Sequence, residues 1–96
     1  FESPTVVQFR VTAGSAHRNN VGTVHGAFLA ALAENSMQLP METRARGSIT
    51  ISLAYDYPAP ATLDQEIAGE VRVVRETGRL VFVTIDLFQG SECVLH

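Results

Sequence analysis

The sequence predicts an α+β fold in which one long helix packs against a single antiparallel β-sheet. Residues 24–39 are good helix formers with apolar side chains at helical spacing, such as Phe28 and Leu32, and Pro40 follows them. Outside this stretch, apolar and polar residues alternate with the period of two that is typical of strands with one buried face. Short turns join the alternating segments after the helix, which favours neighbouring antiparallel strands laid on that helix.

The strand predictions follow this alternation along the chain. Residues 48–57 show it most clearly, because large apolar side chains alternate with small or polar ones until Pro58 ends the pattern. One helix covers only one face of the resulting sheet, so we expect a second subunit on the remaining face or edge. The predicted order is β-α-β-β-β-β, with strands at residues 7–11, 48–57, 65–76, 80–89 and 92–95.

The composition is that of a globular protein. The chain has 96 residues, of which 46% are hydrophobic and 18% charged, with a net charge of −3 and no Lys. The absence of a basic block argues against a nucleic-acid partner. A single Cys, Cys93, excludes an internal disulfide, and three scattered His do not form a zinc ligand set. We therefore expect no metal site.

The ends of the chain and its hydropathy give three further expectations. The chain begins at Phe1 and stops within the last predicted strand, so we expect a single domain, residues 1–96, that lacks flanking terminal residues. The longest strictly apolar run, residues 27–33, is far shorter than the ~20 residues that span a bilayer. No signal peptide is visible. We therefore expect a cytoplasmic protein that does not bind membranes.

The stretch with the strongest chemical character is Asn-Asn-Val-Gly-Thr-Val-His-Gly-Ala at residues 19–27. Gly26 stands at the start of the predicted helix, where backbone N–H groups lack partners and the helix dipole is positive. A Gly there lets a carbonyl group approach an N–H group, which would stabilise an oxyanion formed during acyl transfer. The alternative is a Gly that only permits tight packing between loop and helix.

Glu34 is the second chemical candidate, because it lies in an otherwise apolar part of the predicted helix, between Ala33 and Met37. A carboxylate in this position faces solvent, pairs with another group or takes part in chemistry. It could attack a carbonyl carbon directly, or it could activate a water molecule. The sequence leaves both roles open, beside the alternative of a solvated helix residue.

These residues resemble the Asn-x-x-Gly-x-x-His-Gly-Gly…Asp pattern of hotdog-fold acyl-CoA thioesterases of the phenylacetate-degradation and 4-hydroxybenzoyl-CoA type. The resemblance covers nearly the whole chain and includes Pro60-Ala61 and the turn Gly78-Arg79. It implies a hotdog fold and the hydrolysis of an acyl-CoA or related carrier thioester, with coenzyme A as part of the substrate and no separate cofactor. Glu34 stands where the family commonly has Asp, and Ala27 replaces the second Gly of the motif.

The resemblance also implies roles for three further residues. Asn19 would position the nucleophile or water, and Thr50 on the second predicted strand would hold the attacking water. His25 would mainly orient the loop and the helix start, and proton transfer by His25 is the less favoured role. The alternatives are that Asn19 is only a residue that suits loop geometry and that Thr50 is only a β-branched residue that suits a strand.

Three Arg residues cluster around one predicted hairpin: Arg72, Arg75 and Arg79. The resemblance places the CoA nucleotide near the sheet surface, so we expect at least one of them to contact a CoA phosphate. Arg suits this role because its guanidinium binds phosphate through two parallel hydrogen bonds. A solvated strand face with Glu70 and Glu76 as ion-pair partners is the alternative.

The spacing of Gly26 and Glu34 predicts a site shared between subunits. Eight residues correspond to about 12 Å along a helix, too far for both groups of one helix to serve one carbonyl. Gly26 of one subunit would face Glu34 of the other in a homodimer, or in a homotetramer built from two such dimers. Two other functions stay open, namely a non-catalytic acyl-CoA-binding module and a hotdog-fold dehydratase or hydratase. The latter typically carry Asp-x-x-x-x-His or His-x-Pro patterns that this sequence lacks.

Overall fold

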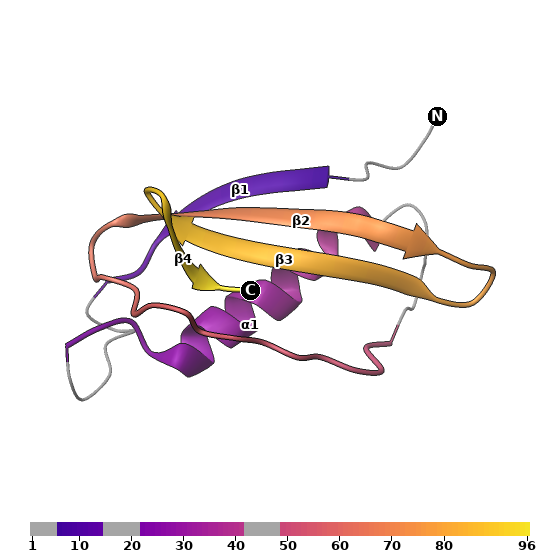
Figure 1. Ribbon diagram of the computed structural model, residues 1–96, viewed down its shortest axis with the longest axis horizontal. Helices are drawn as coiled ribbons and strands as arrows, with labels where there is room; N and C mark the ends of the chain where they lie inside the picture. Colours follow the sequence, from indigo (N-terminus) through magenta and orange to yellow (C-terminus); the bar gives the residue numbers. More distant parts are fainter. Residues whose placement is uncertain (1–5, 15–21, 42–48) are drawn as a thin grey trace.

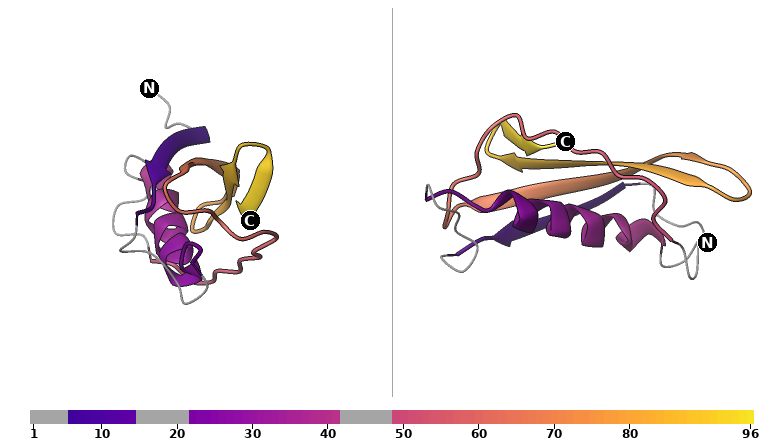
Figure 2. Two further views of the ribbon diagram at one scale, coloured as in Figure 1. Left: turned by 90° about the vertical axis from the view of Figure 1, so that its left-hand side faces the viewer. Right: turned by 90° about the horizontal axis from the view of Figure 1, so that it is seen from below.

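One helix lies along one face of a four-stranded antiparallel sheet in the computed structural model, which describes residues 6–14, 22–41 and 49–96 (Figure 1, Figure 2). The strand order across the sheet is β1-β2-β3-β4, so each strand pairs with its neighbour in sequence. This arrangement confirms the predicted fold class. The elements are β1 (Val6–Thr12), α1 (Gly26–Met37), the short 3₁₀-helix η2 (Leu39–Met41), β2 (Glu66–Glu76), β3 (Val81–Gln89) and β4 (Glu92–Leu95).

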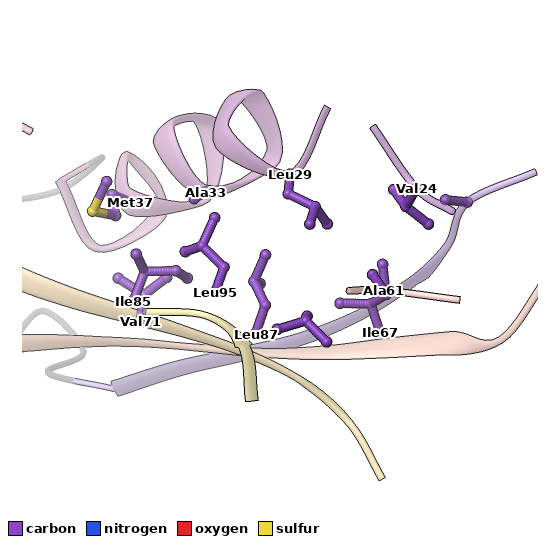
Figure 3. Close-up of a cluster of buried hydrophobic side chains, with 12 residues drawn as sticks. Val24, Leu29, Ala33, Met37, Ala61, Ile67, Val71, Ile85, Leu87 and Leu95 are labelled. Atoms are coloured by element: carbon purple, nitrogen blue, oxygen red, sulfur yellow. The ribbon is translucent and has the colours of Figure 1, made fainter. Parts of the chain in front are cut away.

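The hydrophobic core fills the space between α1 and the inner face of the sheet (Figure 3). The helix contributes residues at intervals of four, and the strands contribute alternate residues, as their periods require. The buried side chains include Leu29, Ala33 and Met37 from α1, Ile67 and Val71 from β2, Ile85 and Leu87 from β3, and Leu95 from β4.

Gly69 on β2 is required by close packing on the inner face of the sheet. It lies opposite Phe9 in the β1–β2 register, and the Phe9 ring folds over it. A Cβ atom at position 69 would stand 2.1 Å from Cζ of Phe9, far inside van der Waals contact. The glycine therefore makes room for the ring that covers this part of the sheet.

The strand predicted at residues 48–57 is wrong for its described part, residues 49–57, which carry no strand assignment. The segment runs extended along the β3–β4 edge, but only Asp56 pairs with it, exchanging backbone hydrogen bonds of 2.7 and 2.9 Å with His96. The physical reason is that a strand requires a ladder of backbone hydrogen bonds, and among the described residues this segment finds a backbone partner only at Asp56. At the start of this segment the side chains of Ile49 and Ile51 are 84% and 80% exposed.

The helix is also shorter than predicted at both ends. Val24 forms an isolated bridge, in which its N–H donates to the carbonyl oxygen of Ala61 at 3.0 Å, and α1 starts only at Gly26. At the other end α1 stops at Met37, and Pro40 lies inside η2. Pro40 cannot extend α1, because proline has no backbone N–H to donate to the carbonyl oxygen four residues earlier. Within the described residues, no helix has the length and apolar character needed to cross a membrane.

Candidate active site

The start of α1 is held by His25, the residue that caps it. Its Nδ1 accepts a hydrogen bond of 3.1 Å from the N–H of Ala27, and its carbonyl oxygen accepts bonds from Phe28 and Leu29. Because Nδ1 is an acceptor here, a neutral His25 carries its proton on Nε2. The orienting role that the family resemblance implies for His25 stays a prediction.

Gly26 is the first residue of α1, so its N–H has no partner inside the helix. Tyr57 lies directly against it. The Tyr57 hydroxyl donates to the carbonyl oxygen of Gly26 at 3.4 Å, and its ring atom Cε1 is 3.8 Å from the place where a Cβ at position 26 would stand. The Tyr57 side chain thus brings residues 49–57 into contact with the start of α1. Sequence reasoning missed this residue, although Tyr57 closes the alternating pattern just before Pro58.

Glu34 lies two turns further along α1 and is exposed in this chain. It borders a cavity of about 800 Å³ between the second half of α1, the segment after residue 49 and the first half of β3. Thr50 lines the same cavity. The structure therefore brings Glu34 and Thr50 to one cavity, whereas Gly26 is not part of its lining. Asn19 lies outside the described residues.

Tyr55 also lines this cavity, and its hydroxyl is the polar atom that sequence reasoning overlooked. The hydroxyl oxygen is buried and has no hydrogen-bond partner among the described residues. Burial raises the pKa of Tyr55, and the nearby Glu34 carboxylate and then Tyr57 raise it further. A signal was present in the sequence, since Tyr55 falls on the apolar side of the 48–57 alternation while carrying a polar tip.

The three candidate Arg residues have different surroundings. Arg72 lies away from the cavity and binds Glu70 at 2.8 Å, and hydrogen bonds from Gln8 and then from Arg72 lower the pKa of Glu70. Arg75 is exposed on β2. Arg79 borders the cavity, in a turn where the Thr77 hydroxyl accepts backbone hydrogen bonds at 3.4 and 3.0 Å. Of the three, only Arg79 reaches the site that contains Glu34.

Comparisons with known proteins define the class to which this fold and site belong. The family model of the Thioesterase superfamily matches residues 21–94, which include Gly26, Glu34 and Thr50. The chain belongs to the thioesterase superfamily.

Related sequences and solved structures agree with this assignment. Human acyl-coenzyme A thioesterase 13 is 29% identical over 73 residues, which cover 74% of this chain, and the mouse protein is 26% identical over the same length. The matched stretch is only 52% of these relatives' own length, so the chain spans about half of them.

Two solved structures share the hotdog fold along almost the whole chain. A mutant of phenylacetic acid degradation protein PaaI from Thermus thermophilus has a TM-score of 0.88 at 22% identity, covering 99% of this chain and 82% of its own. A hypothetical thioesterase protein from Streptococcus pneumoniae, solved with coenzyme A, has a TM-score of 0.89 at 17% identity, covering 99% of this chain and 77% of its own.

Proposed function

We propose that this protein hydrolyses an acyl-CoA or related carrier thioester to a free acid and a thiol. The observation that carries the proposal is the meeting of Glu34 and Thr50, from two separate elements, at one cavity in a chain of the thioesterase superfamily. The human and mouse relatives are named acyl-coenzyme A thioesterases, and a neighbour of the same fold was solved with coenzyme A, which supports CoA as the thiol carrier. Coenzyme A then enters as part of the substrate, and no other cofactor takes part. A cytoplasmic location stays a prediction.

In the general-base route, Glu34 takes a proton from a water molecule held by Thr50 as the water oxygen bonds to the thioester carbon. The carbonyl oxygen becomes an oxyanion and accepts a hydrogen bond from the Gly26 N–H. Collapse of this intermediate breaks the C–S bond, and the thiolate takes up a proton. In the nucleophilic route, the Glu34 carboxylate itself bonds to the thioester carbon, the C–S bond breaks, and the thiolate leaves and takes up a proton. Water then hydrolyses the resulting anhydride to the free acid and the Glu34 carboxylate. Asn19 would position the water or nucleophile in either route.

The two groups that this chemistry needs belong to different subunits in the proposed site. Gly26 and Glu34 are separated by two turns of α1, and only Glu34 borders the cavity. The exposed apolar side chains of the segment beside Thr50 support a homodimer, because a second subunit would cover them. These side chains are Ile49, Ile51, Leu53 and Tyr57. Pairing of two such dimers would give the tetramer.

A thiol-release assay over a panel of acyl-CoAs tests the function. We expect turnover of at least one acyl-CoA that depends linearly on protein concentration, with free CoA and free acid formed in equal amounts. A protein that binds acyl-CoAs in equilibrium dialysis but releases no thiol from any of them would instead be the non-catalytic binding module.

Arg79 is expected to bind a phosphate of CoA, because it is the candidate Arg that borders the cavity. Changing Arg79→Gln removes the charge and should raise KM for acyl-CoA about 10-fold, as expected for a lost charge-assisted contact. The short thioester of N-acetylcysteamine lacks phosphates, so its KM should stay the same. Arg75→Gln serves as the matched control on the same hairpin. Equal effects of Arg79→Gln on both substrates would contradict phosphate binding.

A further inference from the structure

Two hydrogen bonds fix the backbone on either side of the Gly26 N–H group. Before it, the N–H of Val24 donates to the carbonyl oxygen of Ala61 at 3.0 Å, and both residues are buried. After it, the N–H of Ala27 donates to Nδ1 of His25 at 3.1 Å. Figure 3 shows Val24 and Ala61 together at one end of the core. Because the Gly26 N–H lies between these two bonds, its direction depends on where Ala61 is held.

The side chain of Gln89, the last residue of β3, holds the segment around Ala61, where residues 58–65 form no helix or strand. Its Oε1 accepts a hydrogen bond of 2.7 Å from the N–H of Thr62, and its Nε2 donates to the carbonyl oxygen of Thr62 at 2.8 Å. The same Nε2 also donates to the carbonyl oxygen of Gln65 at 3.4 Å. The Gln89 amide therefore binds both backbone groups of Thr62, as a residue of a neighbouring antiparallel strand would do.

The other contacts of this segment cannot replace the Gln89 amide. The N–H of Asp64 donates to the carbonyl oxygen of Ala13 at 2.9 Å, but this bond lies three residues beyond Ala61. The side chain of Ala61 is buried, but a single methyl group makes few contacts that could fix the backbone. Thr62 is exposed, so water would satisfy its backbone groups without Gln89 and would leave their position free.

We propose that Gln89 is a positioning residue for hydrolysis, which sets the direction of the Gly26 N–H toward the oxyanion. The link runs through the backbone of Ala61 and its bond to Val24. This inference rests on the proposed function and adds a group that does not touch the substrate. An oxyanion donor acts through a direction that is fixed before the reaction, so a loosened donor lowers kcat rather than substrate affinity.

Gln89→Met tests this role, because methionine keeps the length of the side chain and removes the amide. At a temperature well below the Tm of the variant, we expect kcat for the best acyl-CoA to fall about 10-fold, less than the ~10²-fold cost of losing an oxyanion donor outright. The Kd of S-hexyl-CoA, a thioether without a carbonyl oxygen, should stay the same. A lower Tm with the kcat of the folded variant unchanged would mean that Gln89 only stabilises the fold, and would overturn the inference.

Two further variants complete the experiment. Gln8→Met is the matched control, because Nε2 of Gln8 donates to Glu70 at 3.1 Å on β1 and β2, so the same substitution breaks a side-chain bond that has no link to Ala61. It should leave kcat unchanged. If Gln89→Met does not fold, Gln89→Glu takes its place, since Glu keeps the acceptor for the Thr62 N–H and presents an oxygen in place of the donor to the Thr62 carbonyl.

Amide hydrogen exchange measured by NMR separates this inference from the proposed function, because it needs no turnover. We expect Gln89→Met to raise the exchange rate of the Val24 N–H about 10-fold or more, and Gln8→Met to leave it unchanged. An unchanged rate at Val24 defeats the inference even if the protein releases thiol. Faster exchange with an unchanged kcat defeats the positioning role and leaves the hydrolase standing. Wild-type protein that releases no thiol defeats the hydrolase and the role of Gln89 in it, while faster exchange would still establish that Gln89 holds Val24.

Discussion

Replacing Glu34 by Gln is expected to lower kcat for the best acyl-CoA by about 10²-fold or more, the range of acid–base and nucleophilic contributions. The substitution keeps the size of the side chain and removes the charge that either route requires. Glu34 is exposed on α1, so the fold should tolerate the change. The loss should therefore appear in kcat at unchanged thermal stability.

Glu92→Gln is the matched control for this experiment. Glu92 is an exposed carboxylate at the start of β4 and is not part of the cavity lining. Its replacement changes the net charge by the same amount and should leave kcat within about twofold of wild type, as is usual for surface substitutions. Hydrolysis by Glu34→Gln at the wild-type rate would remove Glu34 from the mechanism.

A single turnover in ¹⁸O-labelled water distinguishes the two routes open to Glu34. If Glu34 activates water, the first acid released carries ¹⁸O from the solvent. If Glu34 attacks directly and water then opens the anhydride at the Glu34 carbonyl, the first acid carries an unlabelled oxygen from Glu34, and the label enters the protein. Peptide mass analysis of the segment that contains Glu34 records this label.

The sequence predicted the layers of this fold because the local patterns and the packing agree in most elements. The alternation of Val81 to Leu87 and the helical spacing of Leu29 and Ala33 both correspond to buried faces in the structure. Residues 49–57 show the limit of this reasoning. Their alternation is as regular as that of any strand, but a strand needs a partner, and among the described residues only Asp56 has one, at His96.

The candidate site could be predicted only where a residue carries its own chemical signature. His25 and Gly26 stand out because a helix start needs a cap and offers a free N–H, and Glu34 stands out as a charge in an apolar helix. Tyr55 and Tyr57 could not be found in this way. Their importance depends on what their hydroxyls meet, which is decided by tertiary contacts with elements more than 20 residues away in sequence.

The shared site leads to the second large expected effect, recovery of activity on mixing two inactive variants. The first variant is Gly26→Pro, which removes the N–H donor. The structure allows this change, because position 26 is the first of the helix, where proline is tolerated, and His25 already has the extended backbone (φ −64°, ψ 131°) that a following proline requires. The second variant is Glu34→Gln, which removes the carboxylate. Each variant alone lacks one component in every site.

Subunit exchange between these variants would produce heterodimers with one complete site and one site that lacks both groups. In the complete site, Gly26 comes from the Glu34→Gln subunit and Glu34 from the Gly26→Pro subunit. We therefore expect up to about half of the wild-type activity per heterodimer. A site contained within one subunit predicts no recovery, because every subunit in the mixture then carries a defect.

The control for folding is Gly26→Ala, which adds a Cβ atom and keeps the N–H group. This Cβ would meet only the Tyr57 ring, at an ordinary contact distance of 3.8 Å, so the helix start should remain intact. Mass spectrometry of isotopically labelled subunits would first establish that exchange has taken place. Verified heterodimers without activity would contradict the shared site, and so would a fully active monomer in sedimentation. In either case Gly26 and Glu34 would have to act from the same helix. They are about 12 Å apart along it, so they could not both contact one thioester carbonyl.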